Sequence, residues 1–82
     1  MDPIQSTVKD FILEEFLPGV NAAELSPSTP LITGAILDSL ATLQLVAFLE
    51  ERFNIELEAH EASVDHLNTL STIADLVRSK IQ

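Results

Sequence analysis

The chain has 82 residues and no cysteine, and its 13 acidic against 4 basic side chains give a net charge of −9 at pH 7. This length supports a single domain over residues 1–82 with one hydrophobic core, and the missing cysteines exclude disulfides and thiolate zinc sites. Nucleic acid and anionic membrane surfaces are poor partners for such a negative chain, whereas a protein with a basic surface suits it.

The first predicted helix runs from about Pro3 to Leu17. Asp2 suits its N-cap and Pro3 its first position, and Pro18-Gly19 favours its end. Large apolar side chains recur along it at helical spacing and predict one buried face. That face consists of Ile4, Val8, Phe11, Ile12 and Phe16.

A long connection follows from Val20 to Asp38. Its prolines, serines, threonines and Gly34 resist helix formation. It also holds large apolar residues that a solvated linker would not need, so we expect an ordered loop packed against the helices. A plain crossover between two helices that are not neighbours is the alternative. The apolar residues are Leu25, Leu31, Ile32, Ile36 and Leu37.

A second helix is predicted from Ser39 to Phe53. Its start places the Ser39 hydroxyl at a helix N-terminus, where free backbone N–H groups and the helix dipole favour an anion. Asp38 stands directly before this serine, and no histidine or lysine lies nearby in the sequence to act as its base. We therefore expect Ser39 to receive a phosphate-linked group rather than to attack a substrate.

The second helix carries two apolar arcs when successive residues are placed about 100° apart. One arc predicts the core face, and the other predicts an exposed docking surface rimmed by polar and acidic side chains. Packing of the second arc under the long loop is the alternative, and Phe48 lies between the two arcs. The core arc consists of Leu45, Val46, Leu49 and Phe53. The second arc, here called the apolar strip, consists of Leu40, Leu43 and Ala47, and its rim of Gln44, Glu50 and Glu51.

An extended connector is predicted at residues 55–58, where apolar and acidic residues alternate. It has no partner strand, so no sheet is expected. A short helical turn follows from about Glu61 to His66, and we expect Val64 and Leu67 to face inward from it.

The last helix is predicted from about Ser71 to Ile81, with Thr69 or Ser71 as its cap. Its apolar stripe and basic C-terminal end are typical of a helix packed on a core. The expected fold is an all-α four-helix bundle, with a long loop between helices 1 and 2 and a short third helix.

Three stretches of the chain resemble the acyl and peptidyl carrier proteins. GAILDSL at 34–40 is similar to the attachment motif of that family, and LVAFLEERFNI at 45–55 to its recognition helix and the turn after it. TLSTIADLV at 69–77 resembles the start of the family's last helix. The resemblance implies the four-helix bundle, and it implies that a phosphopantetheinyl transferase attaches 4'-phosphopantetheine from coenzyme A to Ser39. The thiol of that arm would hold an acyl or aminoacyl group as a thioester, and the protein itself would not be an enzyme.

The resemblance also implies partners. A loading ligase or acyltransferase would charge the thiol, and a downstream transferase or synthase with a basic docking surface would receive the group. Docking would use the apolar strip with Gln44, Glu50 and Glu51, in the brief contacts that suit a small interface with a polar rim. Asp38 would help the transferase to position the loop or its metal, or would only cap the helix. We expect a monomer.

Some features depart from the fatty-acid carriers. Ala41 follows the motif and Gln44 lies on the helix where those carriers often have acidic residues, and residues 58–67 are longer and less regular than their third-helix region. VDHLNTL at 64–70 looks more like discrete carriers of secondary metabolism, including those that hold amino acids. We therefore expect a role in polyketide or nonribosomal peptide biosynthesis. Fatty acyl, polyketide extender, amino acid and dipeptide cargoes all stay open.

Other functions compete with a carrier. Catalysis at Ser39 would need His60 or His66 as a base, and both lie in the third-helix region. A metal site is disfavoured, because histidines six residues apart share no helix face and the chain lacks the Asp-x-Asp-x-Asp-Gly calcium loop. The clustered residues that such a site would use are His60, Glu61, Asp65 and His66. A small acidic interaction module that docks through the apolar strip, with Ser39 unmodified, is the main alternative.

The sequence shows no targeting or membrane signal. No apolar run approaches the roughly 20 residues that a membrane span needs. Residues Met1–Ile4 lack the basic start of a signal peptide. We therefore expect a cytoplasmic protein, whose acidic charge either attracts basic partners or only keeps it soluble.

Overall fold

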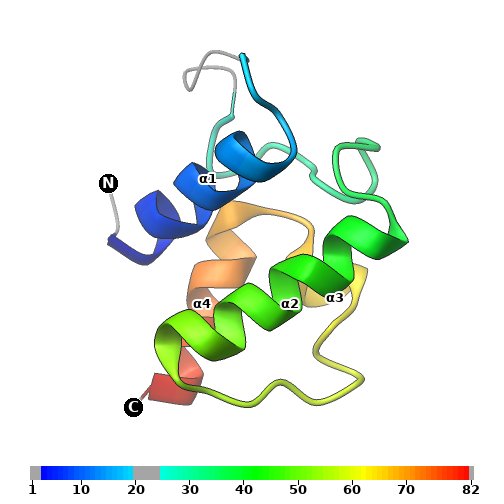
Figure 1. The fold of residues 1–82 in the computed structure, drawn as a ribbon. Helices are drawn as coiled ribbons and strands as arrows, with labels where there is room; N and C mark the ends of the chain where they lie inside the picture. The colour runs from blue at the N-terminus through cyan, green and yellow to red at the C-terminus, as the bar shows by residue number, and fades with distance from the viewer. Residues whose placement is uncertain (1–2, 20–24, 82) are drawn as a thin grey trace.

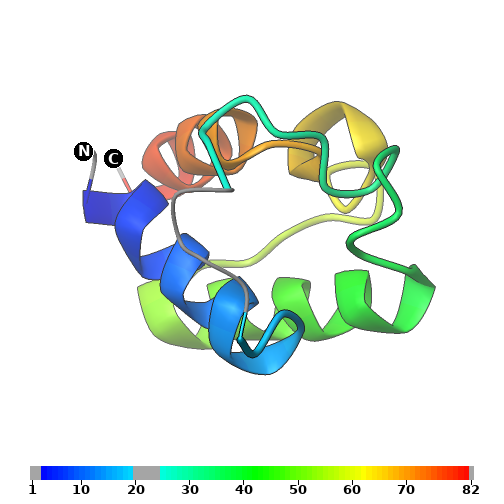
Figure 2. The same cartoon turned by 90° about the horizontal axis from the view of Figure 1, so that it is seen from above.

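The computed structural model describes residues 3–19 and 25–81, and these ranges contain four helices and no strand (Figure 1). The helices are α1 (Pro3–Glu15), α2 (Ser39–Phe53), α3 (Val64–Leu67) and α4 (Leu70–Ile81). α1 and α2 lie along one side of the molecule, and α3 and α4 along the other (Figure 2). The predicted all-α fold with a long loop and a short third helix is confirmed. Within the described ranges, no helix is long and apolar enough to cross a membrane.

α1 begins at Pro3 and ends at Glu15, slightly before the predicted end. The chain stays wound for another turn, since the N–H groups of Phe16 and Leu17 both donate to the Ile12 carbonyl oxygen, at 2.9 and 3.2 Å. Ile12 is fully buried, as is Val8 from the same predicted face. Asp2, the predicted N-cap, lies outside the described residues.

α2 has the predicted bounds because capping groups stand at both of its ends. Asp38 precedes it in an extended conformation, and Asn54 follows it in the left-handed conformation with φ 55°. Asparagine adopts this conformation more readily than most residues, and its backbone N–H donates to the Glu50 carbonyl oxygen. Leu45 and Leu49 of the core arc are fully buried, and the other two members of that arc are partly buried.

Phe48, which lies between the two arcs of α2, packs toward α1. Its ring stacks on Phe11 with the centroids 4.0 Å apart and the planes 11° from parallel. Phe16 meets Phe11 edge to face at 5.6 Å. Aromatic pairs of these kinds stabilise by about 0.5–1.5 kcal/mol beyond the burial of their area. They fix α2 alongside α1 and leave its opposite side for other contacts.

α4 is the helix that α1, α2 and α3 all contact. Its fully buried residues are Leu70, Ile73, Ala74 and Val77. It begins one residue before the predicted start, and the Thr69 hydroxyl oxygen caps it by accepting the Thr72 N–H at 3.1 Å. Across the part of the chain that the structure describes, every buried residue is apolar. The core is therefore a hydrophobic assembly around α4.

α3 is shorter than predicted and begins at Val64, after Ser63 in an extended conformation. Leu67 is fully buried, as expected. The prediction that Val64 faces inward is wrong, because its side chain is 44% exposed. The reason is that residues 59–63 form turns rather than helix, so the helical register that placed Val64 inside does not extend through them.

The loop before α2 is ordered where the structure describes it. Leu25, Leu31 and Leu37 are at most 2% exposed, and the remaining large apolar residues of the loop are partly buried. Gly34 is required by sterics, because a Cβ at this position would collide with the carbonyl oxygen of Pro30. The expectation of a packed loop is confirmed for these residues.

Candidate functional site

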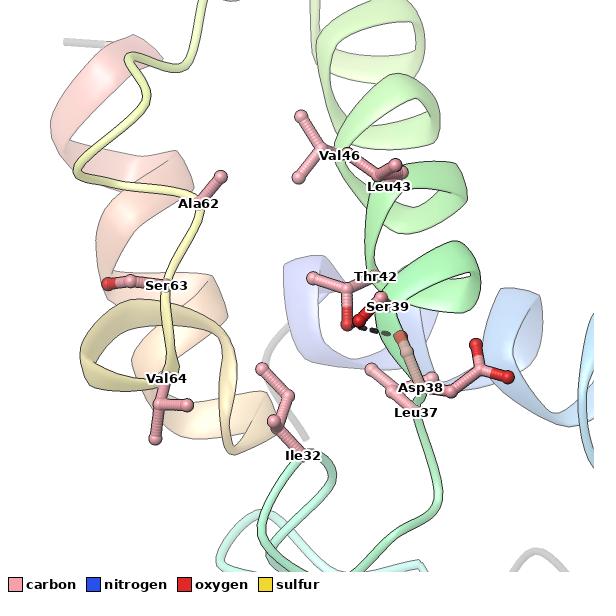
Figure 3. Close-up of a pocket in the computed structure, with 10 residues that line it drawn as sticks. All are labelled: Ile32, Leu37, Asp38, Ser39, Thr42, Leu43, Val46, Ala62, Ser63 and Val64. Carbon is pink, nitrogen blue, oxygen red and sulfur yellow. Dashed lines mark hydrogen bonds between the residues drawn. The ribbon is translucent and has the colours of Figure 1, made fainter.

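Ser39 is the exposed first residue of α2, and its backbone position is fixed by the residue before it. The Asp38 carboxylate accepts the Ala41 N–H at 2.7 Å, which is an N-cap contact. The Asp38 carbonyl oxygen accepts the N–H of Thr42 at 2.9 Å and its hydroxyl at 2.8 Å, the bond dashed in Figure 3. The serine hydroxyl is thus presented from a helix start that is held by the hydrogen bonds of Asp38 to Ala41 and Thr42.

The electrostatics at this helix start favour an added negative charge. The N–H groups of Ser39 and Leu40 have no intrahelical acceptor, as for the first residues of any helix. They and the helix dipole stabilise an anion by about 0.3–1 kcal/mol at an exposed site. A phosphodiester on Ser39 fits this position, and the neighbouring Asp38 carboxylate offsets part of the gain.

A groove of about 710 Å3 opens beside Ser39, between α2 and residues 62–64 (Figure 3). Its walls are mostly apolar, and Val46 and Ala62 point toward one another across it. The Ser63 hydroxyl points away from α2 and donates to the His60 carbonyl oxygen at 3.0 Å. The residues that line this Ser39 groove are Ile32, Leu37, Asp38, Ser39, Thr42, Leu43, Val46, Ala62, Ser63 and Val64.

The Ser39 groove was not predicted from the sequence. Its far wall contains Val64, which was predicted to face the core and is instead exposed. The signal that could have found it is Val46, which lies at the edge of the core arc and makes the apolar surface of α2 wider than one buried face requires.

The loop that leads to Ser39 is held by Asn68, at the junction of α3 and α4. The Asn68 side-chain oxygen accepts the N–H groups of Ile32 at 2.9 Å and Thr33 at 3.0 Å. The Asn68 carbonyl oxygen accepts the N–H of Leu31 at 2.6 Å. The role of Asn68 was not predicted, because an isolated asparagine gives no sign of partners 35 or 36 positions away in the chain.

The structure exposes the apolar strip on α2. Leu40 and Leu43 are 64% and 65% exposed, so the alternative in which they pack under the loop is wrong. Ala47 of the strip is exposed, as are Gln44 and Glu51 of its rim. An exposed strip of this kind beside a modifiable serine is available to a partner protein.

Among the rim residues, Glu50 differs from Gln44 and Glu51 in its burial. It is half-buried, and its carboxylate oxygen accepts the Leu57 N–H at 2.9 Å. Glu50 therefore holds the extended connector against α2 as well as bordering the strip. A helical projection cannot show this contact, because the connector returns to α2 only after the chain reverses at Asn54.

Ionisable side chains outside the groove gather before α3. The side-chain oxygen and nitrogen atoms of Glu58, His60 and Glu61 that could bind a metal ion lie within 4.8 Å of one another. However, Glu61 already forms an ion pair with Lys80, with an Nζ–Oε1 distance of 2.7 Å. The Lys80 hydrogen bond, helped by the Glu58 backbone, holds the pKa of the Glu61 carboxyl below its ordinary value. Neither His60 nor His66 lines the Ser39 groove. Ser39 thus lies exposed at the capped start of α2, and no histidine lines the groove beside it.

A family model described as "phosphopantetheine attachment site" matches residues 12–78. The chain belongs to this family. The expected membership of the carrier proteins is thereby confirmed, as are the cofactor, 4'-phosphopantetheine, and the non-enzymatic role of such domains. Carrier domains of this family interact in general with phosphopantetheinyl transferases and biosynthetic enzymes. The matched residues contain the Ser39 groove, the loop before it and the apolar strip.

Proposed function

We propose that Ser39 is the residue of this carrier that bears the phosphopantetheine arm. The observation that supports it is the exposed hydroxyl at the capped start of α2, beside an apolar groove and within residues 12–78. When attached, the arm supplies a thiol that holds the carried acyl or aminoacyl group as a thioester. The protein's own residues present the attachment point, accommodate the added negative charge and offer surfaces to partner enzymes.

Asp38 has two tasks in this proposal. Its cap to the Ala41 N–H fixes the first turn of α2, the turn that carries Ser39. Its carboxylate belongs to an exposed residue, so it is also accessible to the transferase or to the transferase's metal. The first task concerns stability and the second concerns the rate of modification, which makes them separable by substitution.

The Ser39 groove and the apolar strip have different roles in this proposal, contact with the arm or its cargo for the groove and docking of partner enzymes for the strip. The groove offers apolar walls, such as Val46 and Ala62, to the apolar part of the arm or its cargo. The strip, with Leu40 and Leu43 most exposed, would meet the transferase, the loading ligase or acyltransferase and the downstream enzyme. The net charge of −9 would draw basic surfaces on these partners toward the strip.

We place this carrier in polyketide or nonribosomal peptide biosynthesis, as a monomer in the cytoplasm. The support is the sequence itself: Ala41 and Gln44 replace residues that are often acidic in fatty-acid carriers, and 64–70 resembles discrete carriers of secondary metabolism. An assay of loading by adenylating ligases and by acyltransferases, with the holo protein as acceptor, tests this placement. Loading by a fatty-acid acyltransferase alone would contradict it.

The attachment site is tested by intact mass after incubation with coenzyme A, magnesium and a broad-specificity transferase. The wild type should gain one phosphopantetheine, and Ser39→Ala should gain none while keeping its circular dichroism spectrum. Ser63→Ala is the matched control, because it removes another serine of the groove wall and should still be loaded. A mass gain on Ser39→Ala would assign attachment to another residue. A wild type that gains nothing would favour the unmodified interaction module instead.

A further inference from the structure

Asn68 joins two parts of the chain that meet beside Ser39. It follows Leu67, the last residue of α3, and precedes α4. Its side chain binds the backbone of Ile32 and Thr33, which belong to the loop that leads into α2. Because Ile32 and Val64 both line the Ser39 groove, Asn68 connects the loop residues of the groove to its α3 residues.

Both the oxygen and the NH2 group of the Asn68 carboxamide form hydrogen bonds to the loop. Its oxygen accepts two backbone N–H groups at 2.9 and 3.0 Å, and its NH2 group donates to the Thr33 hydroxyl at 3.2 Å. The backbone carbonyl oxygen of Asn68 also accepts a hydrogen bond from the Leu31 N–H at 2.6 Å. Three successive loop N–H groups, at residues 31 to 33, thus point at one residue of the α3–α4 junction.

These bonds continue toward Ser39 through the loop backbone. The Leu31 carbonyl oxygen accepts the N–H groups of Ile36 at 2.9 Å and Leu37 at 2.8 Å, which closes residues 31–37 into a compact turn. Leu31 and Leu37 are buried at the two ends of this turn. Asp38 and Ser39 come directly after it, so a displacement of the turn from Asn68 would move the start of α2 or loosen it.

We propose that Asn68 is a positioning residue for the modification of Ser39, which rests on the proposed function of that serine. It holds the loop at residues 31–37 against the α3–α4 junction, so that the transferase meets the Asp38-Ser39 pair in one conformation. Without the Asn68 side-chain oxygen, only a fraction of the molecules would present this conformation. The apparent affinity of a partner falls by that fraction, while turnover at saturation stays the same.

The test compares four variants as acceptors for phosphopantetheine transfer. Asn68→Leu removes the acceptor oxygen and should raise the KM for the carrier about tenfold with kcat nearly unchanged, the signature of a reduced competent fraction. Asn68→Asp keeps an acceptor for both N–H groups and should restore the wild-type KM. Thr33→Val removes only the hydroxyl contact to Asn68 and should also keep the wild-type KM. Ile73→Val trims a fully buried side chain of α4, leaves the Asn68 hydrogen bonds intact and controls for lost stability.

A second readout does not involve the transferase. Amide hydrogen exchange at Ile32, Thr33, Ile36 and Leu37 should speed up about tenfold in Asn68→Leu relative to Ile73→Val, at equal folded fraction. If Asn68→Leu fails to fold by circular dichroism, Asn68→Ser, whose side chain is too short to bridge both N–H groups, takes its place.

The outcomes separate this inference from the proposed function. A wild type that is loaded normally, with an Asn68→Leu variant of equal KM and equal loop exchange, would overturn the positioning role alone. A raised KM that Asn68→Asp does not restore would also overturn it, because the acceptor oxygen would then not be the cause. A wild type that is never loaded would overturn the proposed function of Ser39, and the positioning role with it.

Discussion

Lys80, near the end of α4, forms an ion pair with Glu61, whose Oε1 lies 2.7 Å from the lysine Nζ. Their side chains are 26% and 13% exposed, which makes this pair better shielded than Glu58–His60 or Asp75–Arg78 in the described chain. Glu61 directly precedes Ala62, Ser63 and Val64, the far wall of the Ser39 groove. The pair therefore ties that wall to the central helix.

The first prediction concerns the pH dependence of this ion pair. The Lys80 hydrogen bond lowers the pKa of Glu61 from its ordinary 4.5, and the Glu61 hydrogen bond raises the pKa of Lys80 from its ordinary 10.5. A carboxyl whose folded pKa is lowered stabilises the fold fully above 4.5, and the contribution is lost as the pH falls through the folded pKa. For the lysine the contribution is complete below 10.5 and is lost as the pH rises through its raised value.

Thermal melts of the wild type and Lys80→Gln, recorded from pH 3 to pH 8, check this expectation. The wild type should melt higher at neutral pH, and the difference should shrink steadily below about pH 4.5, where carboxyl protonation begins in the unfolded chain. Asp75→Asn, which breaks the exposed Asp75–Arg78 contact at 3.4 Å, is the control and should show little change. A difference that persists unchanged at pH 3 would contradict a role for the Glu61 charge.

The second prediction separates the two tasks of Asp38. Asp38→Ala removes the cap on the Ala41 N–H and should lower the free energy of unfolding by about 1 kcal/mol. Asp38→Asn keeps a capping oxygen and should unfold like the wild type in urea, but it lacks the charge and should be loaded by the transferase more slowly. Equal loading of Asp38→Asn and wild type would leave Asp38 with capping alone.

The predictable parts of this molecule are those with local signals. The bounds of α2 follow from a polar cap at Asp38 and from a helical apolar period that stops at Phe53. The inward orientation of Val64 was wrong, because a four-residue helix offers too little periodicity to fix which way its first residue faces. The contacts of Asn68 and Glu50 escaped prediction for one physical reason: their partners are backbone N–H groups brought near by chain reversals, and every residue type except proline supplies those.

The third prediction distinguishes the apolar strip from the Ser39 groove. Leu40 belongs to the strip and does not line the groove, Val64 lines the groove and lies on α3, and Leu43 takes part in both. We expect Leu40→Asp and Leu43→Asp to keep their helical spectra and to weaken transfer to partner enzymes about tenfold or more, as for exposed anchors of an interface. Steady-state KM for each carrier variant measures this loss.

Val64→Asp is the matched control for that comparison. It places the same charge on the opposite wall of the groove, where the side chain is 44% exposed, and should leave partner KM closer to the wild-type value. An unfolded Leu43→Asp would place Leu43 in the core despite its 65% exposure. Equal losses in Leu40→Asp and Val64→Asp would argue against docking through the α2 strip.

The last prediction concerns repulsion among the acidic side chains. A net charge of −9 on 82 residues disfavours the compact state, and salt shortens the range of this repulsion to about 10 Å at 0.1 M. We expect moderate NaCl or MgCl2 to raise the melting temperature by about 5 °C, which corresponds to roughly 1 kcal/mol for a domain of this size.

Glu15→Gln at the end of α1 tests the cause, because that exposed carboxylate also opposes the helix dipole. The variant should melt higher than the wild type at low salt and respond less to added salt. A melting temperature that stays flat or falls with salt would show that the repulsion does not exceed the attraction within pairs such as Glu61–Lys80.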